Sequence, residues 1–162
     1  MSRFAEVRHQ QWIAAPVPVV RAQFADLDHH VRANVHPKLR FEVLHCDADG
    51  ARYVQEVKLL GIRQGDVFER RFDADGTMHD DAIEGFNRGG TLSFRFAPEA
   101  REGRPGTRVE IAIRLPLPPL IGPLLRPLLE AQVRREVREA ALQDQFDIEQ
   151  RGYPRHDPRL AA

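Results

Sequence analysis

Three histidines within eight residues are the feature of this sequence most able to do chemistry: His29, His30 and His36. An imidazole titrates near neutral pH, so it can act as a general acid or base, and it is also a common metal ligand. The group therefore has two interpretations. It forms a reactive or metal-binding site, or it is the polar, solvent-facing end of a short helix, which its spacing favours.

Arg70 is a second candidate because it shares the face of a predicted strand with Phe68 and Phe72. Burying a guanidinium is costly unless it is paired. Arg70 could therefore hold a ligand carboxylate or phenolate, with Glu56 as its partner in the protein, or it could extend to the rim of a pocket.

His45 alternates onto the apolar face of an earlier strand, where it could act as an acid or base or be a buried structural histidine. Its neighbour Cys46 has no metal-ligand spacing and no activating base, so we expect a packing residue. We expect Asp80, Asp81 and Glu84 to lie on a solvated strand edge.

Apolar and polar residues alternate in seven segments that are separated by turn sequences rich in Gly, Asp and Asn. The predicted strands are 6–14, 39–46, 52–62, 66–72, 77–86, 91–96 and 107–115, with one turn at Gln64–Gly65. Strands at such regular spacing predict an antiparallel meander. Pro16 and Pro18 suit the first turn of a short helix at 17–26, and a second helix or irregular turn at 28–36 ends before Pro37.

The C-terminal third predicts one long amphipathic helix after a proline-rich hinge at 116–123. Apolar residues recur every four positions and form one stripe: Leu125, Leu129, Val133, Val137 and Ala141. We expect a single helix over 127–150, with Arg134 and Arg138 exposed and the two valines buried. Only the sheet is large enough to bury this stripe, so the helix should lie across it and leave a pocket between them.

Length and composition limit the function classes. A chain of 162 residues fits one domain, and 24 basic against 24 acidic residues argue against a general nucleic-acid binder. A single cysteine excludes an intrachain disulfide, and the chain has no apolar run long enough to span a membrane and no signal-peptide pattern. We expect a cytoplasmic protein, monomeric or homodimeric, without stable membrane insertion.

Three local sequences resemble the helix-grip fold of the SRPBCC or START-like superfamily, which includes the birch-pollen allergen and a polyketide cyclase/dehydrase branch. Ile13-Ala-Ala-Pro-Val-Pro-Val-Val20 is similar to its strand-to-helix entry, Phe24-Ala-Asp-Leu27 to the end of that helix, and Gly106-Thr-Arg-Val109 to the start of its last strand. The resemblance covers about residues 5–152 and leaves 153–162 as a tail. It implies a single α+β domain over 1–162, in which a curved sheet of about seven antiparallel strands is gripped by a long C-terminal helix.

A second resemblance concerns the histidines. The segment from Asp26 to His36 lies, in chain order, where Rieske-type oxygenases of the same superfamily keep an Asp and two iron-binding histidines. Their third ligand is an Asp on a late helix, where Asp144 or Asp147 could stand. A metal-dependent enzyme using His30, His36 and Asp144 is thus one alternative. The histidine spacing differs and cluster cysteines are lacking, so we expect no metal and no cofactor.

The leading hypothesis is that the protein binds a small hydrophobic molecule (a lipid, sterol or aromatic polyketide) as a carrier, a sensor or a cyclase/dehydratase-like enzyme. In an enzyme, His45 and Arg70 would be the catalytic candidates. A third hypothesis is a protein-interaction module whose cavity is filled. The side chains expected to line the cavity are Tyr53, Val57, Phe68, Arg70, Phe72, Phe94, Phe96, Ile111, Ile113, Val133 and Val137.

Overall fold

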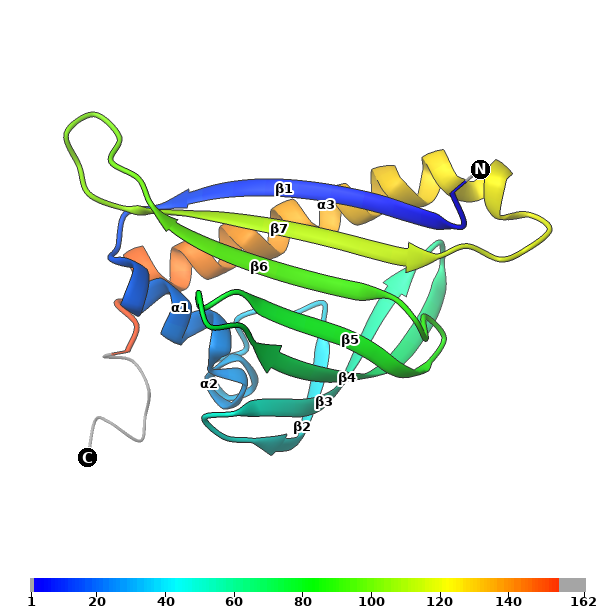
Figure 1. The fold of residues 1–162 in the computed structure, drawn as a ribbon, viewed down its shortest axis with the longest axis horizontal. Coiled ribbons are helices and arrows are strands. Elements are labelled where there is room, and N and C mark those ends of the chain that lie inside the picture. Colours follow the sequence, from blue (N-terminus) through cyan, green and yellow to red (C-terminus); the bar gives the residue numbers. More distant parts are fainter. Residues whose placement is uncertain (1, 155–162) are drawn as a thin grey trace.

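Seven antiparallel strands form one curved sheet in the computed structural model, which describes residues 2–154 (Figure 1). The strands are β1 (Phe4–Ile13), β2 (Arg40–Cys46), β3 (Gly50–Leu59), β4 (Ile62–Phe72), β5 (Met78–Gly85), β6 (Thr91–Pro98) and β7 (Thr107–Pro116). Their order in the sheet is β1-β7-β6-β5-β4-β3-β2, so β2 to β7 meander and β1 pairs with the last strand. The predicted fold class is confirmed. Residues 155–162 of the expected tail lie outside the described part.

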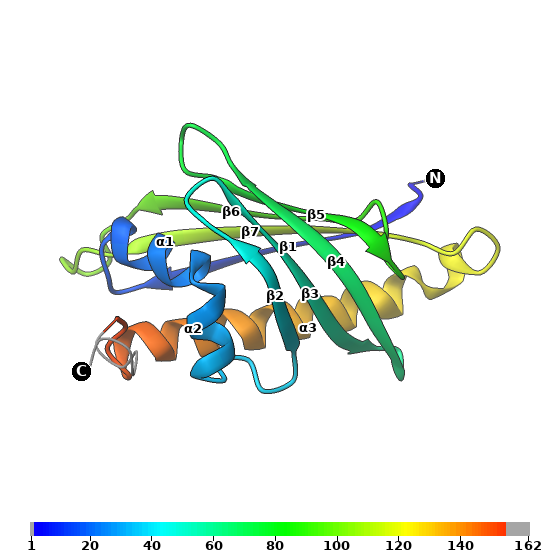
Figure 2. The same cartoon turned by 90° about the horizontal axis from the view of Figure 1, so that it is seen from below.

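Two short helices carry the chain from β1 at one edge of the sheet to β2 at the other. Helix α1 spans Val17–Ala25 and α2 spans Leu27–Arg32, and both lie beside the C-terminal end of the long helix α3 (Figure 2). Asp26 separates α1 from α2. Its carboxylate accepts a hydrogen bond from the backbone N–H of His29 at 3.0 Å and so caps α2.

Helix α3 spans Gly122–Glu149 as one continuous helix that crosses the sheet (Figure 2). Val133 and Val137 are buried and Arg134 and Arg138 are exposed, as predicted. The helix begins earlier than expected, because Pro123 lies in its first turn, where its missing N–H costs nothing.

The turn between β3 and β4 lies at Leu60–Gly61, so the predicted turn at Gln64–Gly65 is wrong. Leu60 and Gly61 have φ angles of 50° and 76°, which suit a tight hairpin turn. Gln64 belongs to β4 and its side chain is buried, where its amide oxygen accepts a hydrogen bond from Asn87 at 3.0 Å. The polar residue at position 64 therefore reflects a buried hydrogen bond and not a solvent-exposed turn.

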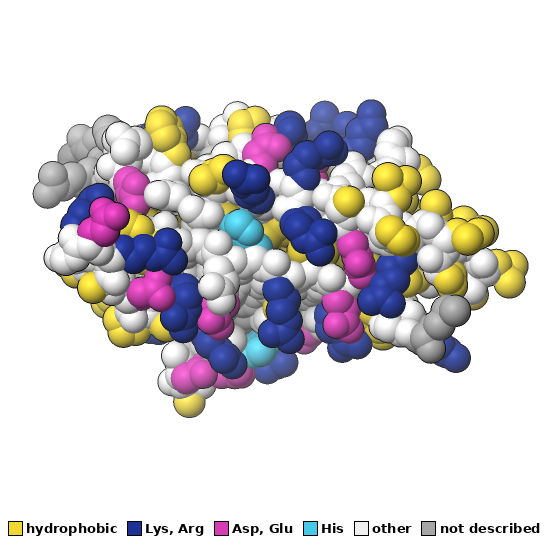
Figure 3. Space-filling view, turned by 90° about the horizontal axis from the view of Figure 1, so that it is seen from above, with side chains coloured by type: hydrophobic (Ala, Val, Ile, Leu, Met, Phe, Trp, Pro, Cys, Tyr) yellow, Lys and Arg dark blue, Asp and Glu magenta, His cyan; other side chains and the backbone are white. Residues whose placement is uncertain are grey.

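The surface mixes charges of both signs on the face that Figure 3 shows, and hydrophobic side chains gather at one end of it. Leu120 lies just before α3 and is 92% exposed, and Leu124 lies in the first turn of α3 and is 83% exposed. Within the described residues, no helix is both long and apolar enough to cross a membrane.

Adjacent leucines of α3 provide a test of the packing against the sheet. Leu129 is 7% exposed and belongs to the main core, whereas Leu128 is 59% exposed. We predict that Leu129→Ala lowers the free energy of unfolding by about 2–5 kcal/mol, and that Leu128→Ala changes it by less than about 0.5 kcal/mol. Urea denaturation measures both. Equal effects would mean that α3 does not pack on the sheet by this face.

Candidate functional site

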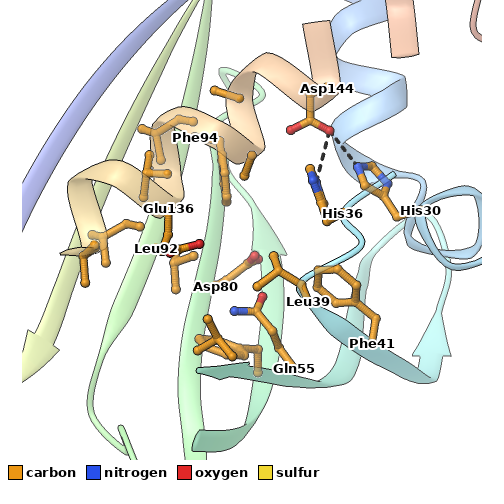
Figure 4. Close-up of a pocket in the computed structure, with 18 of the residues that line it drawn as sticks. His30, His36, Leu39, Phe41, Gln55, Asp80, Leu92, Phe94, Glu136 and Asp144 are labelled. Atoms are coloured by element: carbon orange, nitrogen blue, oxygen red, sulfur yellow. Dashed lines mark hydrogen bonds and ion pairs between the residues drawn. The ribbon is translucent and has the colours of Figure 1, made fainter. Parts of the chain in front are cut away.

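A cavity of about 170 Å³ lies between the sheet and α3 (Figure 4). Of the eleven side chains expected to line it, all but two do so: Tyr53, Val57, Phe68, Arg70, Phe94, Ile111, Ile113, Val133 and Val137. The apolar faces of the strands and the stripe on α3 therefore meet as the sequence predicts, and the space between them is not filled.

Phe72 and Phe96 do not line the cavity, so the expectation for these two residues is wrong. Phe96 is buried with its ring 5.5 Å from that of Phe24 on α1. Phe72 is the last residue of β4 and packs against the main core. The alternation pattern gives the inner face of a strand, but not which part of that face a helix covers.

Arg70 points inward, and its partner is Asp80 on the neighbouring strand β5. Its Nε and one terminal nitrogen donate to the two carboxylate oxygens of Asp80, both at 2.7 Å, and its other terminal nitrogen donates to the carbonyl oxygen of Phe24 at 3.0 Å. The Tyr53 hydroxyl donates to Asp80 at 2.6 Å. Each guanidinium nitrogen thus has a protein acceptor.

Two expectations about the carboxylates near Arg70 are wrong. Glu56 is not the partner of Arg70, because it lies near the surface with Arg63 at 3.5 Å. Asp80 is fully buried and not on a solvated edge. The residues next to Asp80 in the sequence do not indicate that its carboxylate pairs with an arginine on the neighbouring strand.

Burial sets the protonation of this network. Burial of the phenol and the charge of Asp80 beside it raise the pKa of Tyr53 well above its usual value. Burial opposes the charge on Arg70, but the hydrogen bonds and charge of Asp80 outweigh it and raise the pKa of Arg70. The sheet therefore carries a charged Arg70 and a neutral Tyr53, both bonded to Asp80.

The three histidines are buried, so the solvent-facing interpretation is wrong: His29, His30 and His36 are 0%, 6% and 8% exposed. The Nε2 atoms of His30 and His36 lie 3.0 and 3.3 Å from Oδ1 of Asp144 on α3. Figure 4 shows the three side chains His30, His36 and Asp144 converging at one end of the cavity. Their ligating atoms all lie within 4.8 Å of one another.

A second pair continues this network along α3. His29 Nε2 lies 2.8 Å from Oδ2 of Asp147. The amide nitrogen of Gln23 donates to both carboxylates, at 3.0 Å to Asp144 and 3.1 Å to Asp147. The helices α1, α2 and α3 are joined by one buried polar network.

Opposite charges shift the pKa values in this network. Burial disfavours the charged form of His36, but the charge of Asp144 and hydrogen bonds to Asp144 and Gln143 raise the pKa of His36. Burial likewise disfavours the charged form of Asp144, yet His36 and His30 hold its pKa well below the usual range.

His45 and Cys46 lie on the surface and not in the cavity or the core. The His45 side chain is 65% exposed and pairs with Asp47 at 2.7 Å, and Cys46 is exposed. The β2–β3 register shifts between Val43 and His45, so the alternation that predicts an inward His45 is interrupted.

Neighbouring aspartates of β5 test the buried ion pair. Asp80→Asn should lower the free energy of unfolding by about 3–5 kcal/mol, because it leaves a buried Arg70 without its counter-charge. Asp81→Asn is the control. The Asp81 side chain is 43% exposed and 3.6 Å from Arg71, so its loss should cost less than about 1 kcal/mol. Chemical denaturation of both variants would contradict this if the two losses were alike.

Tyr53 gives the protein a specific alkaline sensitivity. An unfolded tyrosine ionises near pH 10, whereas the pKa of folded Tyr53 is raised. Its contribution to stability is therefore full below about pH 10 and is lost as the pH rises toward the folded pKa. We predict that the free energy of unfolding falls more steeply between about pH 10 and 11 in the wild type than in Tyr53→Phe. Parallel curves would show that Tyr53 ionises freely in the folded state.

Comparison with protein-family models and with curated proteins gives no match. Several solved structures are similar. The protein TTHA0849 from Thermus thermophilus has a TM-score of 0.75 and 21% identity, over 88% of this chain and 96% of that one. A START superfamily protein from Mycobacterium smegmatis has a TM-score of 0.69 and 14% identity, over 88% and 97%. The Zhui aromatase/cyclase from Streptomyces has a TM-score of 0.68 and 18% identity, over 92% and 98%.

At these identities the likeness extends to the fold, and it agrees with the element order and the sheet topology. The chain therefore has the helix-grip fold that START superfamily and aromatase/cyclase proteins share.

Proposed function

We propose that this protein binds a small, mainly apolar molecule in the cavity between the sheet and α3. The observation that carries the proposal is the open space of about 170 Å³. A dry apolar cavity of about 150 Å³ is enough to bind benzene. The enclosed part of the ligand would thus be about the size of one or two rings.

The lining of the cavity defines the ligand further. Aliphatic and aromatic side chains from β3, β6, β7 and α3 form most of its wall: Val57, Leu92, Phe94, Ile111, Ile113, Val133 and Val137. Polar groups enter at the end formed by His30, His36 and Asp144, and elsewhere through side chains such as Gln55 and Asn87. Such a pocket, with apolar walls and a few polar fixtures, suits an apolar molecule that carries one polar group.

Carriage or sensing is favoured over the proton-transfer chemistry first assigned to Arg70 and His45. The raised pKa of Arg70 keeps it charged, and all its nitrogens are engaged. His45 lies outside the cavity. The Zhui aromatase/cyclase has a similar fold, but a fold alone does not define an activity. A cyclase-like role would therefore depend on residues other than Arg70 and His45.

A ligand screen tests the proposal. We expect 2-naphthol or dodecanoate to raise the melting temperature by about 5–10 °C at a hundredfold excess over Kd, where binding contributes about 2.7 kcal/mol. Glucose and AMP should cause no shift.

Matched variants of β7 locate the binding. Ile111 lines the cavity, and Ala112 points to the other face of the strand. Ile111→Trp should abolish the shift while the protein stays folded, and Ala112→Trp should retain it. If Ile111→Trp unfolds the protein, the site is a packed core. That result, or shifts unchanged in Ile111→Trp, would refute the proposal.

A further inference from the structure

The hydrogen bonds of His30 and His36 fix where each ring carries its proton. Nδ1 of His30 lies 2.8 Å from the carbonyl oxygen of Asp26, and Nδ1 of His36 lies 2.8 Å from the amide oxygen of Gln143. An amide or carbonyl oxygen can only accept, so each Nδ1 must donate. In its neutral form, each ring then has a lone pair on Nε2.

Both lone pairs point at the same carboxylate oxygen, Oδ1 of Asp144, at 3.0 and 3.3 Å. The amide nitrogen of Gln23 donates to the same oxygen at 3.0 Å. Nε2 of His30, Nε2 of His36 and Oδ1 of Asp144 thus converge in a buried site, where the two imidazole ring centroids are 5.1 Å apart. A single cation placed between these three atoms would contact all of them.

We propose that Nε2 of His30, Nε2 of His36 and Oδ1 of Asp144 bind one divalent transition-metal ion. Ligands about 2.0–2.2 Å from a shared ion are separated from one another by roughly 3.0–3.5 Å. The two distances to Oδ1 fall in this range, and the ligand atoms of the two histidines, which lie within 4.8 Å of each other, would draw together around the ion. Two imidazoles and a carboxylate suit zinc or iron(II) and are poor ligands for magnesium or calcium. The Nδ1–H bonds to oxygen are the outer contacts that orient metal-binding histidines.

The site opens to the cavity, because all three residues line it (Figure 4). Three protein ligands leave coordination positions that water or an oxygen atom of a bound molecule can take. The metal-binding proposal does not depend on the proposed function, since the ligand atoms converge whether or not an apolar molecule enters.

The spacing of the histidines led us to expect no metal, and the fold removes that objection. After α2 the chain turns back on itself, with the N–H of Val35 bonded to the carbonyl of His30 at 3.2 Å and Asn34 at a φ of 48°. This turn returns His36 to the side of His30. The ligands are then set by the turn and not by the number of residues between them.

Cobalt(II) is the probe for this site, because its visible absorption reports both stoichiometry and coordination. We expect one Co²⁺ per chain, displaced by Zn²⁺. His36→Ala and Asp144→Asn should each weaken binding at least about 100-fold, since loss of even an outer contact typically costs about 10–100-fold.

Asp147→Asn is the matched control, because Asp147 is also a buried carboxylate on α3 but its hydrogen bonds go to His29 and Gln23 and to none of the three metal ligands. It should bind Co²⁺ within a few-fold of the wild type. His45→Ala controls for surface histidines. Absence of binding by the wild type, or tight binding that survives in both His36→Ala and Asp144→Asn, would overturn the proposal.

A measurement on the wild type covers the case in which those variants do not fold. In imidazole ¹⁵N spectra, Zn²⁺ should shift the Nε2 resonances of two of the seven histidines while their Nδ1 atoms stay protonated. If Zn²⁺ shifts none of them, or shifts the exposed histidines instead, the buried set is not the site.

Discussion

Two carboxylates of α3 lie in the interior and need polar partners there, and that constraint places the helices. Asp144 and Asp147 enter the interior from α3, where an unpaired carboxylate would be costly. Gln23 on α1 and His29 and His30 on α2 provide hydrogen-bond partners for them. The end of α3 is thus held by polar contacts, whereas its middle is held by apolar ones.

This division explains why a cavity remains. The arginine–aspartate–tyrosine network fills part of the sheet face, and the histidine–aspartate network closes the far end beneath α1 and α2. Between them aliphatic and aromatic side chains form most of the lining, and a few polar side chains such as Gln55 and Asn87 take part in it. The side chains of the two networks cannot turn into that space without losing their hydrogen-bond partners. The curvature of the sheet also keeps α3 from packing directly against its centre. The result is a mainly apolar cavity whose lining includes both polar networks.

The sequence predicts the elements well because each rests on a local pattern. Alternation identifies the strands, and the i, i+4 stripe identifies α3 and the burial of Val133 and Val137. What local patterns miss is polar burial. Asp80 and Asp144 look solvated in a window of a few residues, and their partners lie elsewhere: His30 is 114 positions from Asp144. Alternation also fails where the register shifts, as it does before His45. In the sequence, the histidines and the carboxylates of α3 were connected only by the resemblance to Rieske-type oxygenases.

Helix α3 has 28 residues and is about 42 Å long. It carries both the valines that line the cavity and the buried aspartates Asp144 and Asp147. Val137 and Asp144 lie seven residues apart, two turns along the same face. A ligand too large for the cavity would have to displace α3 outward. That displacement would also move Asp144 and Asp147 away from the histidines. The upper limit on ligand size is therefore set by polar contacts, because α3 can move outward only as far as the hydrogen bonds of Asp144 and Asp147 allow.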